Sequence, residues 1–271
     1  MTPTRAFVYV ATGDGYVTEA RRSAESLRAQ HPDATIVLMT DAAQADLAPF
    51  SQVIVRNDAR RNPSDKLWVA DAPFDQVVFL DTDTLVCGPI EELFDLLATH
   101  DLAALQENHR GWDYDLPGVP ACYPEFNTGV IAFRRTPAMQ RFFAAWRASY
   151  DELRTAQNLK NDQPAFRRAL FGSELRVATL PSEFHFLANV PNYTMWQVRL
   201  LHGRGDLPAI AREVNAELGA RAYVPHVGVL RGYIGRAKWA RTLARVAWRM
   251  LGGVVRPPAD ASEASPGRWW L

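Results

Sequence analysis

The chain has 271 residues, with 30 Lys and Arg against 30 Asp and Glu, so its formal net charge is zero. This balance argues against broad nucleic-acid binding, which requires a basic surface. Hydrophobic residues make up 48% of the chain, and no apolar stretch reaches the roughly 20 residues of a membrane span. The two cysteines, Cys87 and Cys122, do not have the spacing of a metal site. We therefore expect a cytoplasmic globular protein with a substantial core.

The first third of the chain alternates between strand and helix patterns. Short apolar runs typical of buried strands occupy residues 6–11, 35–41, 52–56 and 77–81. Residues 16–30 have a helical periodicity, and residues 67–70 form a short helical stretch. Strands that alternate with helices predict βαβ units and a mainly parallel sheet.

The middle of the chain continues this pattern with one interruption. We expect helices at 89–100, 137–154, around 161–170 and at 207–218, and strands at 101–107, 126–135 and 198–203. Residues 108–124 are rich in Gly, Pro and aromatic residues, and a loop of this length inside a compact domain is usually functional or mobile. Residues 1–234 contain no repeat and no linker, so we expect one α/β domain there.

The last segment, residues 235–271, differs in composition. Residues 236–251 predict a helix with an apolar stripe of Trp239, Leu243, Val246, Ala247 and Met250 and an opposite face of Lys238, Arg241, Arg245 and Arg249. Such a basic amphipathic helix either packs its stripe on the domain or lies on an anionic membrane surface at the inner face. The remaining tail has the composition of a disordered segment.

Two carboxylates follow the apolar strand in the stretch VVFLDTDTLV, residues 77–86. Ligands of open α/β sheets bind at the carboxyl ends of strands, where Asp81 and Asp83 fall. Two carboxylates so close repel each other, which makes it costly for both to be ionised, and a bound divalent cation removes this cost. A single Asp would suffice for a helix cap. The pair therefore predicts a metal or catalytic site.

Two chemistries fit this motif. DTDT matches the start of haloacid dehalogenase-type phosphatases, but three predicted strands precede it and no suitable acidic pair follows it. The other chemistry is glycosyl transfer from a nucleotide diphosphate sugar, where a metal stabilises the departing diphosphate.

Six motifs in matching order make residues 5–204 resemble the GT-A glycosyltransferases of family 8, the glycogenin-like nucleotide-diphospho-sugar transferases. The motifs are VYVATGDGY (8–16), SDKLW (64–68), FLDTDTLV (79–86), FNTGV (126–130), NDQ (161–163) and LLHG (200–203). The resemblance implies a single Rossmann-like GT-A domain and an enzyme that uses Mn²⁺ or Mg²⁺. It would move a hexose from a UDP-sugar, with retention of configuration, to an unknown carbohydrate, lipid-linked or protein acceptor.

The resemblance also implies roles for individual residues. Asp83 would be the main metal ligand, Asp81 would bridge metal and ribose, and His202 would complete the metal site. Imidazole suits Mn²⁺ beside two carboxylates, and His226 is the alternative ligand. The residues implied at the donor are Ala11 and Thr12 near the base, Tyr16 stacking on it, Lys66 at the phosphates, Asn127 and Asp162 at the sugar and Gln163 near the anomeric carbon.

Departures from the family leave some questions open. The stretch that usually follows the histidine is missing, and Arg204 is the candidate replacement for its lysine. Gly13 stands where many relatives carry Asn or Asp, which leaves the base preference open. Aromatic residues of the long loop, Trp112, Tyr114 and Tyr123, either line an acceptor site or pack on each other. A non-catalytic sugar-nucleotide-binding protein is the remaining alternative.

Overall fold

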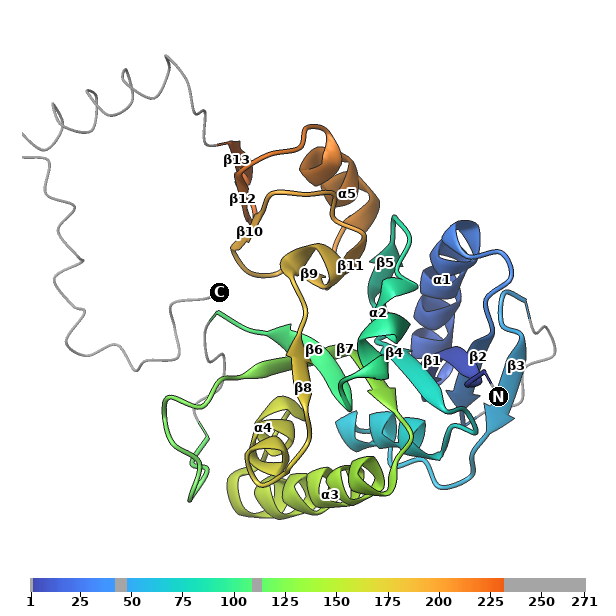
Figure 1. Cartoon of the computed structure of the whole chain (residues 1–271), viewed down its shortest axis with the longest axis vertical. Coiled ribbons are helices and arrows are strands. Elements are labelled where there is room, and N and C mark those ends of the chain that lie inside the picture. Colours follow the sequence, from blue (N-terminus) through green and yellow to red (C-terminus); the bar gives the residue numbers. More distant parts are fainter. Residues whose placement is uncertain (1, 42–47, 109–113, 232–271) are drawn as a thin grey trace, which may run out of the picture.

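The structure is a computed structural model that describes residues 2–41, 48–108 and 114–231 (Figure 1). The segment 236–251 and Trp112 lie outside the described residues, so the membrane prediction and one of the acceptor predictions are not addressed. The domain boundary predicted near residue 234 stays a prediction. Among the described residues, no helix is long and apolar enough to cross a membrane.

A seven-stranded sheet forms the centre of the molecule, in the order β3-β2-β1-β4-β7-β6-β8. The strands are β1 (Arg5–Ala11), β2 (Ile36–Thr40), β3 (Gln52–Val55), β4 (Gln76–Leu80), β6 (Leu102–Gln106), β7 (Phe126–Arg134) and β8 (Val177–Thr179). Four neighbouring pairs are parallel, and β7 is antiparallel to both β4 and β6. The expected α/β fold with a mostly parallel sheet is confirmed, and the sheet is mixed.

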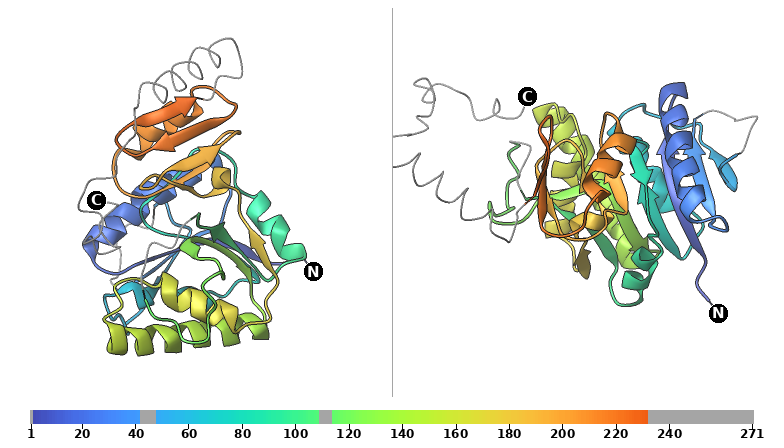
Figure 2. Two further views of the ribbon diagram at one scale, coloured as in Figure 1. Left: turned by 90° about the vertical axis from the view of Figure 1, so that its left-hand side faces the viewer. Right: turned by 90° about the horizontal axis from the view of Figure 1, so that it is seen from above.

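Helices cover both faces of this sheet, because successive residues of each strand point to opposite faces. One face packs against η1 (Pro63–Asp71), α3 (Pro137–Gln157) and α4 (Gln163–Phe171). The other packs against α1 (Asp14–Gln30), α2 (Glu92–Asp95) and η2 (Leu96–Ala98) (Figure 2). The helix predicted at 89–100 is therefore two short elements, and the one at 67–70 belongs to a longer 3₁₀ helix.

Two small sheets and α5 (Leu207–Asn215) form a lobe beyond the central sheet (Figure 1). One small sheet has the order β5-β11-β9, from β5 (Thr84–Val86), β11 (Leu200–His202) and β9 (Phe186–Leu187), which follows η3 (Ser182–Phe184). The other has the order β10-β12-β13, from β10 (Asn192–Thr194), β12 (Arg221–Val224) and β13 (Gly228–Arg231). The strand predicted at 198–203 therefore belongs to this lobe and not to the central sheet.

The pairing of β5 with β11 positions the predicted metal ligands. Three residues separate the end of β4 from the start of β5, and β5 runs antiparallel to β11, which places His202 opposite Thr84. The carbonyl of Asp83 accepts a hydrogen bond from the amide of Gly203 at 3.0 Å. A backbone ladder therefore brings together two segments more than a hundred residues apart.

Candidate functional site

The two aspartates lie where the chain leaves the central sheet. The amide of Asp81 donates to the carbonyl of Gly129 on β7 at 2.7 Å, which continues the pairing of β4 with β7 by one residue. Between the two aspartates, the buried Thr82 hydroxyl donates to the carboxylate of Glu19 on α1 at 2.9 Å. Thr82 is thus held by α1, and the carboxylates on either side of it meet β11.

Asp81, Asp83 and His202 form a cluster with the ligand types of a divalent cation site. The Nε2 atom of His202 lies 3.3 Å from Oδ1 of Asp83 and 3.7 Å from Oδ2 of Asp81. One ligand atom from each residue lies within 4.8 Å of the others. Two carboxylates and an imidazole suit Mn²⁺, so the residues fit the implied metal. His226, the alternative ligand, lies in the turn between β12 and β13 and is not part of this cluster.

The His202 ring is held from two sides. Its Nδ1 atom lies 3.0 Å from Nε2 of His185, a fully buried residue, so Nε2 of His202 is the nitrogen that faces the aspartates. On the other side, a Cβ atom at Gly129 would overlap the ring, so only glycine fits there. Burial, together with the charges of His202 and Lys66, lowers the pKa of His185 well below its usual value. His185 is therefore neutral at physiological pH.

Lys66 links the metal cluster to the start of α4. Its Nζ atom lies 3.1 Å from Oδ2 of Asp81 and 3.4 Å from Oδ2 of Asp162. It also donates to the backbone carbonyl and to the hydroxyl of Thr128, both at 3.2 Å. Burial lowers the pKa of this ammonium group, but Asp162 and Asp81 outweigh burial and raise it above its usual value. Lys66 is therefore a fixed positive charge inside the site.

The two aspartates have different protonation behaviour. Burial raises the pKa of Asp81 even though Lys66 and His202 act in the opposite direction. Burial would also raise the pKa of Asp83, but His202 and Arg204 outweigh it and lower that pKa to about 2. Arg204, with Nε 3.4 Å from Oδ2 of Asp83, also pairs with Glu19. The predicted Arg204 thus lies beside the cluster.

A second polar group surrounds Glu107, at the end of β6. One oxygen of Glu107 accepts from Nδ2 of Asn127 at 2.7 Å and from Nε2 of Gln163 at 2.9 Å. Asp162 precedes α4 as its N-cap residue but makes no side-chain capping bond, so its carboxylate is directed to Lys66 instead. The predicted Asn127, Asp162 and Gln163 are therefore brought together by Glu107 and Lys66.

The predicted base-binding loop follows β1. Ala11 is buried, Thr12 is half-buried, and Tyr16 on α1 is 53% exposed. Gly13 has φ 84°, which favours glycine, and its amide donates to Oδ1 of Asp41 at 2.8 Å. This backbone bond is the main cause of the lowered pKa of Asp41. Asp41 follows β2 and lies beside the loop, although the sequence analysis did not single it out.

The described aromatic residues of the long loop pack against the protein. The hydroxyl of Tyr114 accepts from the amide of Lys160 at 3.2 Å. The ring of Tyr123 meets Phe171 edge-on, with centroids 5.1 Å apart. Both residues thus contact the region around α4 rather than each other, and their predicted place in an acceptor site stays a prediction.

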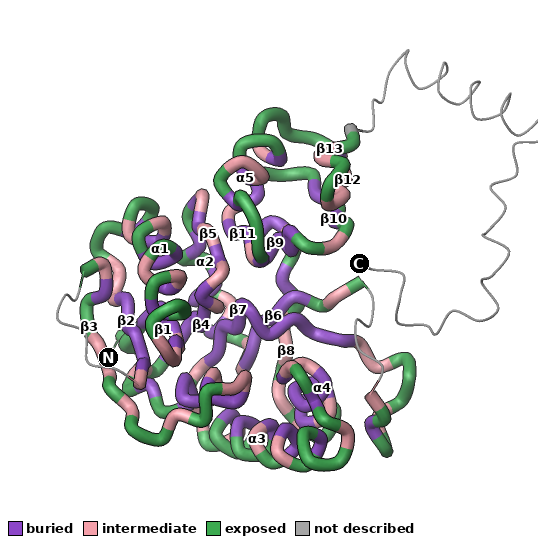
Figure 3. Tube along the Cα trace, turned by 180° about the vertical axis from the view of Figure 1, so that it is seen from behind, coloured by how far each residue is buried: buried purple, intermediate pink, exposed green. Residues whose placement is uncertain are grey.

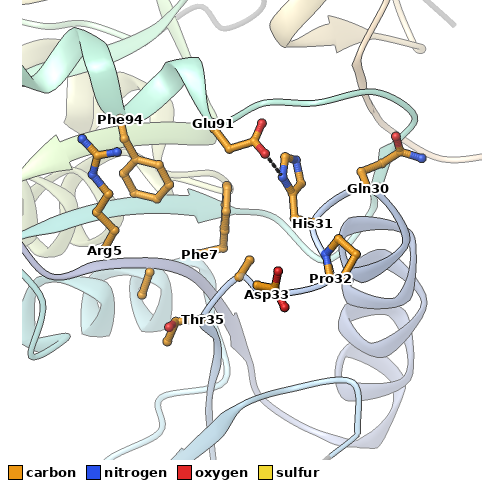
Figure 4. A pocket seen from close by; sticks show the side chains of 11 residues that line it. Arg5, Phe7, Gln30, His31, Pro32, Asp33, Thr35, Glu91 and Phe94 are labelled. Atoms are coloured by element: carbon orange, nitrogen blue, oxygen red, sulfur yellow. Dashed lines mark hydrogen bonds and ion pairs between the residues drawn. The ribbon is translucent and has the colours of Figure 1, made fainter.

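Two clefts lie at opposite ends of the central sheet. One, of about 300 Å³, is bordered by Glu107 and by residues around β10, including Asn192 and Tyr193. The other, of about 350 Å³, lies at the amino end of β1 (Figure 4). There the buried His31 contacts Glu91 at 2.6 Å and accepts from the amide of Ile90 at 3.2 Å. These bonds hold α1 to the segment before α2, which is a structural role.

No protein-family model and no curated protein matches the chain. Among solved structures, it is similar to the glycosyltransferase GlyE of Streptococcus pneumoniae TIGR4, with 14% identity, a TM-score of 0.53, and 92% of this chain and 64% of that one covered. It is also similar to the bifunctional glycosyltransferase WbbM, with 16% identity, a TM-score of 0.51, and coverage of 76% and 46%.

A third match is the galactosyltransferase LgtC in complex with donor and acceptor sugar analogues, with 16% identity, a TM-score of 0.48, and coverage of 94% and 98%. The chain thus spans less than two thirds of GlyE and less than half of WbbM. In this fold the DTDT motif follows β4, which does not support the phosphatase alternative. The matches to GlyE and WbbM show that the chain has the GT-A fold of these glycosyltransferases.

Proposed function

We propose that the protein is a metal-dependent glycosyltransferase that moves a hexose from a UDP-sugar to an acceptor with retention of configuration. The observation that carries the proposal is the cluster of Asp81, Asp83 and His202 next to a buried cationic Lys66, in a GT-A fold. A nucleotide diphosphate is a poor leaving group unless its negative charge is stabilised. The site offers positive charge where such a group would depart.

In this proposal, Asp81, Asp83 and His202 hold Mn²⁺ or Mg²⁺, which when bound acts as a Lewis acid on the diphosphate. Lys66 and Arg204 both contact these aspartates, so each is placed to approach a phosphate bound at the metal. Lys suits this task as a compact point charge. Ala11, Thr12 and Tyr16 would contact the nucleotide, with Tyr16 exposed for stacking on the base.

The sugar would lie over the group formed by Asn127, Asp162 and Gln163. Glu107 accepts from both amides and so fixes their orientation, and the side-chain carbonyl of Asn127 accepts from the amide of Gly129 at 2.9 Å. The 300 Å³ cleft borders Glu107 and is therefore the candidate entrance for the acceptor. Its lining residues are uncharged apart from Glu107 among those that the structure describes, which suits a neutral carbohydrate.

The direct test is UDP release from UDP-glucose and UDP-galactose, with and without Mn²⁺, for the wild type and for Asp83→Ala. We expect release by the wild type only with metal, and none by the variant. Binding of UDP-sugars without release under any condition would favour the non-catalytic alternative. Turnover by Asp83→Ala at the wild-type rate would overturn the metal assignment.

We also propose how the enzyme reaches its acceptor, and this second proposal rests on the sequence of residues 236–251. Four basic residues on one helical face could bring the enzyme to a lipid-linked acceptor, because each is worth about 1 kcal/mol near an anionic surface. Co-sedimentation with anionic and neutral vesicles, for the full chain and for a version ending at Gly235, tests this. Equal recovery of both proteins in the supernatant would contradict it.

A further inference from the structure

The small sheet β10-β12-β13 is apolar on its outer face, whereas its inner face also carries the buried polar residues Asn192, Thr194 and Arg221. Its register pairs Tyr193 with Ala222 and Ala222 with Leu230, and paired residues of an antiparallel sheet share a face. The inner face, which includes Tyr223 and Val229, packs on the core of the lobe. On the outer face lie Tyr193, Ala222, Val224, Gly228 and Leu230.

This outer face is exposed. Tyr193 is 56% and Leu230 is 51% exposed, and Met195, two residues beyond Tyr193, is 44% exposed. In Figure 3 the described part of β13 is intermediate and exposed, whereas β4 of the central sheet is buried throughout. Antiparallel sheets with one wet face normally alternate apolar and polar residues. Within the described part of these strands, the outer face carries no charged side chain, so this sheet has the pattern of one that is covered.

The position at which the described chain ends suggests what covers it. Arg231 is the last residue of β13 and pairs through β12 with Thr194, next to the exposed Met195. Only residues 232–235 separate this point from the segment 236–251. Four residues can span up to about 13 Å, whereas three strands lie within about 10 Å of one another. The segment can therefore reach any point of the outer face.

We propose that the segment 236–251 docks on this sheet as a helix, with its stripe of Trp239, Leu243, Val246, Ala247 and Met250 against Tyr193, Ala222 and Leu230. A helix is about 10 Å wide, which matches a three-stranded face. A tether of four residues gives a high effective concentration, which favours this occupant over free partners. The docked helix turns its basic residues, Lys238, Arg241, Arg245 and Arg249, away from the sheet.

The dimensions disfavour a second copy as the occupant. A stable protein–protein interface needs about 800 Å² per partner. Three strands of three or four residues offer a face on the order of 10 Å by 13 Å. A single helix can cover such a face, whereas a dimer would need a much larger contact than this sheet provides.

The test is limited trypsin digestion of the full chain without lipid, with cleavage sites identified by mass spectrometry. Docking should slow cleavage after Arg241, Arg245 and Arg249 relative to cleavage after Arg268 in the tail. Leu230→Glu places a charge under the stripe and should speed the first three cuts by about tenfold. Leu218→Glu, at an exposed apolar residue outside these strands, is the matched control and should change nothing.

A second variant tests whether faster cleavage in Leu230→Glu comes only from local unfolding of β13. Tyr193→Thr, on the opposite edge strand, keeps a strand-forming residue and should also speed the three cuts. The proposal is overturned if the wild type and both sheet variants are cut equally fast after Arg241 and Arg268. It is also overturned if protection appears only with anionic vesicles, which would assign the stripe to a membrane. Protection that rises with protein concentration, together with a dimeric mass, would overturn it in favour of a second copy.

Discussion

Asp83 lies between an imidazole and a guanidinium. Its oxygens lie 3.3 Å from Nε2 of His202 and 3.4 Å from Nε of Arg204. Because its pKa is lowered to about 2, Asp83 is ionised throughout the physiological range. A carboxylate so placed can bind a cation without first losing a proton.

We expect Asp83→Asn to lower the affinity for Mn²⁺ by at least about tenfold, because the amide keeps the shape but lacks the charge that a hard cation requires. Asp81→Asn should have a similarly large effect. Thr82→Ser is the control between them, since serine keeps the hydroxyl that donates to Glu19. Isothermal titration with Mn²⁺ measures all three. If Thr82→Ser lowered the Mn²⁺ affinity as much as Asp83→Asn does, the affinity would depend on the conformation of this segment and not on the charge of Asp83.

His202 depends on His185 for the orientation of its ring. The His185→Leu variant should bind Mn²⁺ about tenfold to a hundredfold more weakly, as expected for loss of a hydrogen bond to a metal ligand. His185→Asn should restore part of the affinity, because an amide can accept from Nδ1 of His202. His202→Ala should weaken binding more than His226→Ala. Mn²⁺ titration of the four variants decides both points, and a larger loss from His226→Ala would transfer the ligand role to that residue.

The sequence predicted this site unevenly at the residue scale. Asp81 and Asp83 could be predicted from the sequence because their motif is local and follows a strand with a buried pattern. Glu107 has the same signal, a carboxylate directly after an apolar strand, and could have been found by it. His185 has no such signal, since its role arises from the pairing of β9 with β11.

At the scale of elements, β7 contributes a glycine that leaves room for the His202 ring. Gly129 lies against the His202 ring, and its carbonyl accepts from the amide of Asp81. We expect Gly129→Ala to keep the fold but to weaken Mn²⁺ binding by about tenfold or more, because the added Cβ displaces a ligand. Gly172→Ala is the control, since a Cβ there meets its nearest atom at 3.8 Å. Unchanged Mn²⁺ affinity in Gly129→Ala would mean that the ring can move without cost.

Asp101 joins three strands at the opposite end of the sheet. Its Oδ1 accepts from Nε and Nη2 of Arg134, the last residue of β7, at 2.9 and 2.7 Å. Its Oδ2 accepts from the amide of Arg176, just before β8, at 2.8 Å. Burial would raise the pKa of Asp101, but the Arg176 amide and Arg134 outweigh it and lower the pKa. Asp101 therefore stabilises the fold above the pKa of the unfolded chain, and this contribution is lost as the pH falls through the lower folded value.

We expect Asp101→Asn to reduce the free energy of unfolding by about 1 kcal/mol at pH 7, a modest value because Arg134 is partly exposed. The difference from the wild type should be smaller at pH 3, which lies below the usual pKa of an aspartate, and should shrink further as the pH falls through the lower folded pKa. Urea unfolding at both pH values measures this. Asp95→Asn, at an exposed carboxylate, is the control. An equal difference at pH 7 and pH 3 would rule out a role for the charge.

The sequence predicted whether a segment is a strand or a helix better than it predicted which strands pair with each other. The strand patterns at 126–135 and 198–203 were correct, because alternating and apolar runs report local periodicity. Periodicity carries no information on direction or neighbour, so the antiparallel course of β7 and the placement of β11 in the lobe could not be read from it. The short elements at 89–100 reflect tertiary contacts that override helix propensity.

At the scale of the whole molecule, the cluster of Asp81, Asp83 and His202 lies between two cores. Asp81 and Asp83 extend from the central sheet, whereas His202 belongs to β11, whose Leu201 packs in the core of the lobe. A cation bound by all three residues would therefore tie the lobe to the central sheet. Because the unfolded chain lacks this arrangement, metal binding must favour the folded state.

We therefore expect Mn²⁺ to raise the melting temperature of the full chain. At a concentration one hundred times the dissociation constant, binding adds about 2.7 kcal/mol to the free energy of unfolding. For a chain of this size that corresponds to a rise of about 5–10 °C. EDTA should reverse the rise, and UDP added after Mn²⁺ should increase it further if the diphosphate binds at the metal. Differential scanning calorimetry of the wild type and Asp83→Asn provides the comparison, because the variant should show little response to Mn²⁺. An equal rise in both proteins would place the stabilising ion elsewhere on the molecule and would remove the link between the lobe and the central sheet.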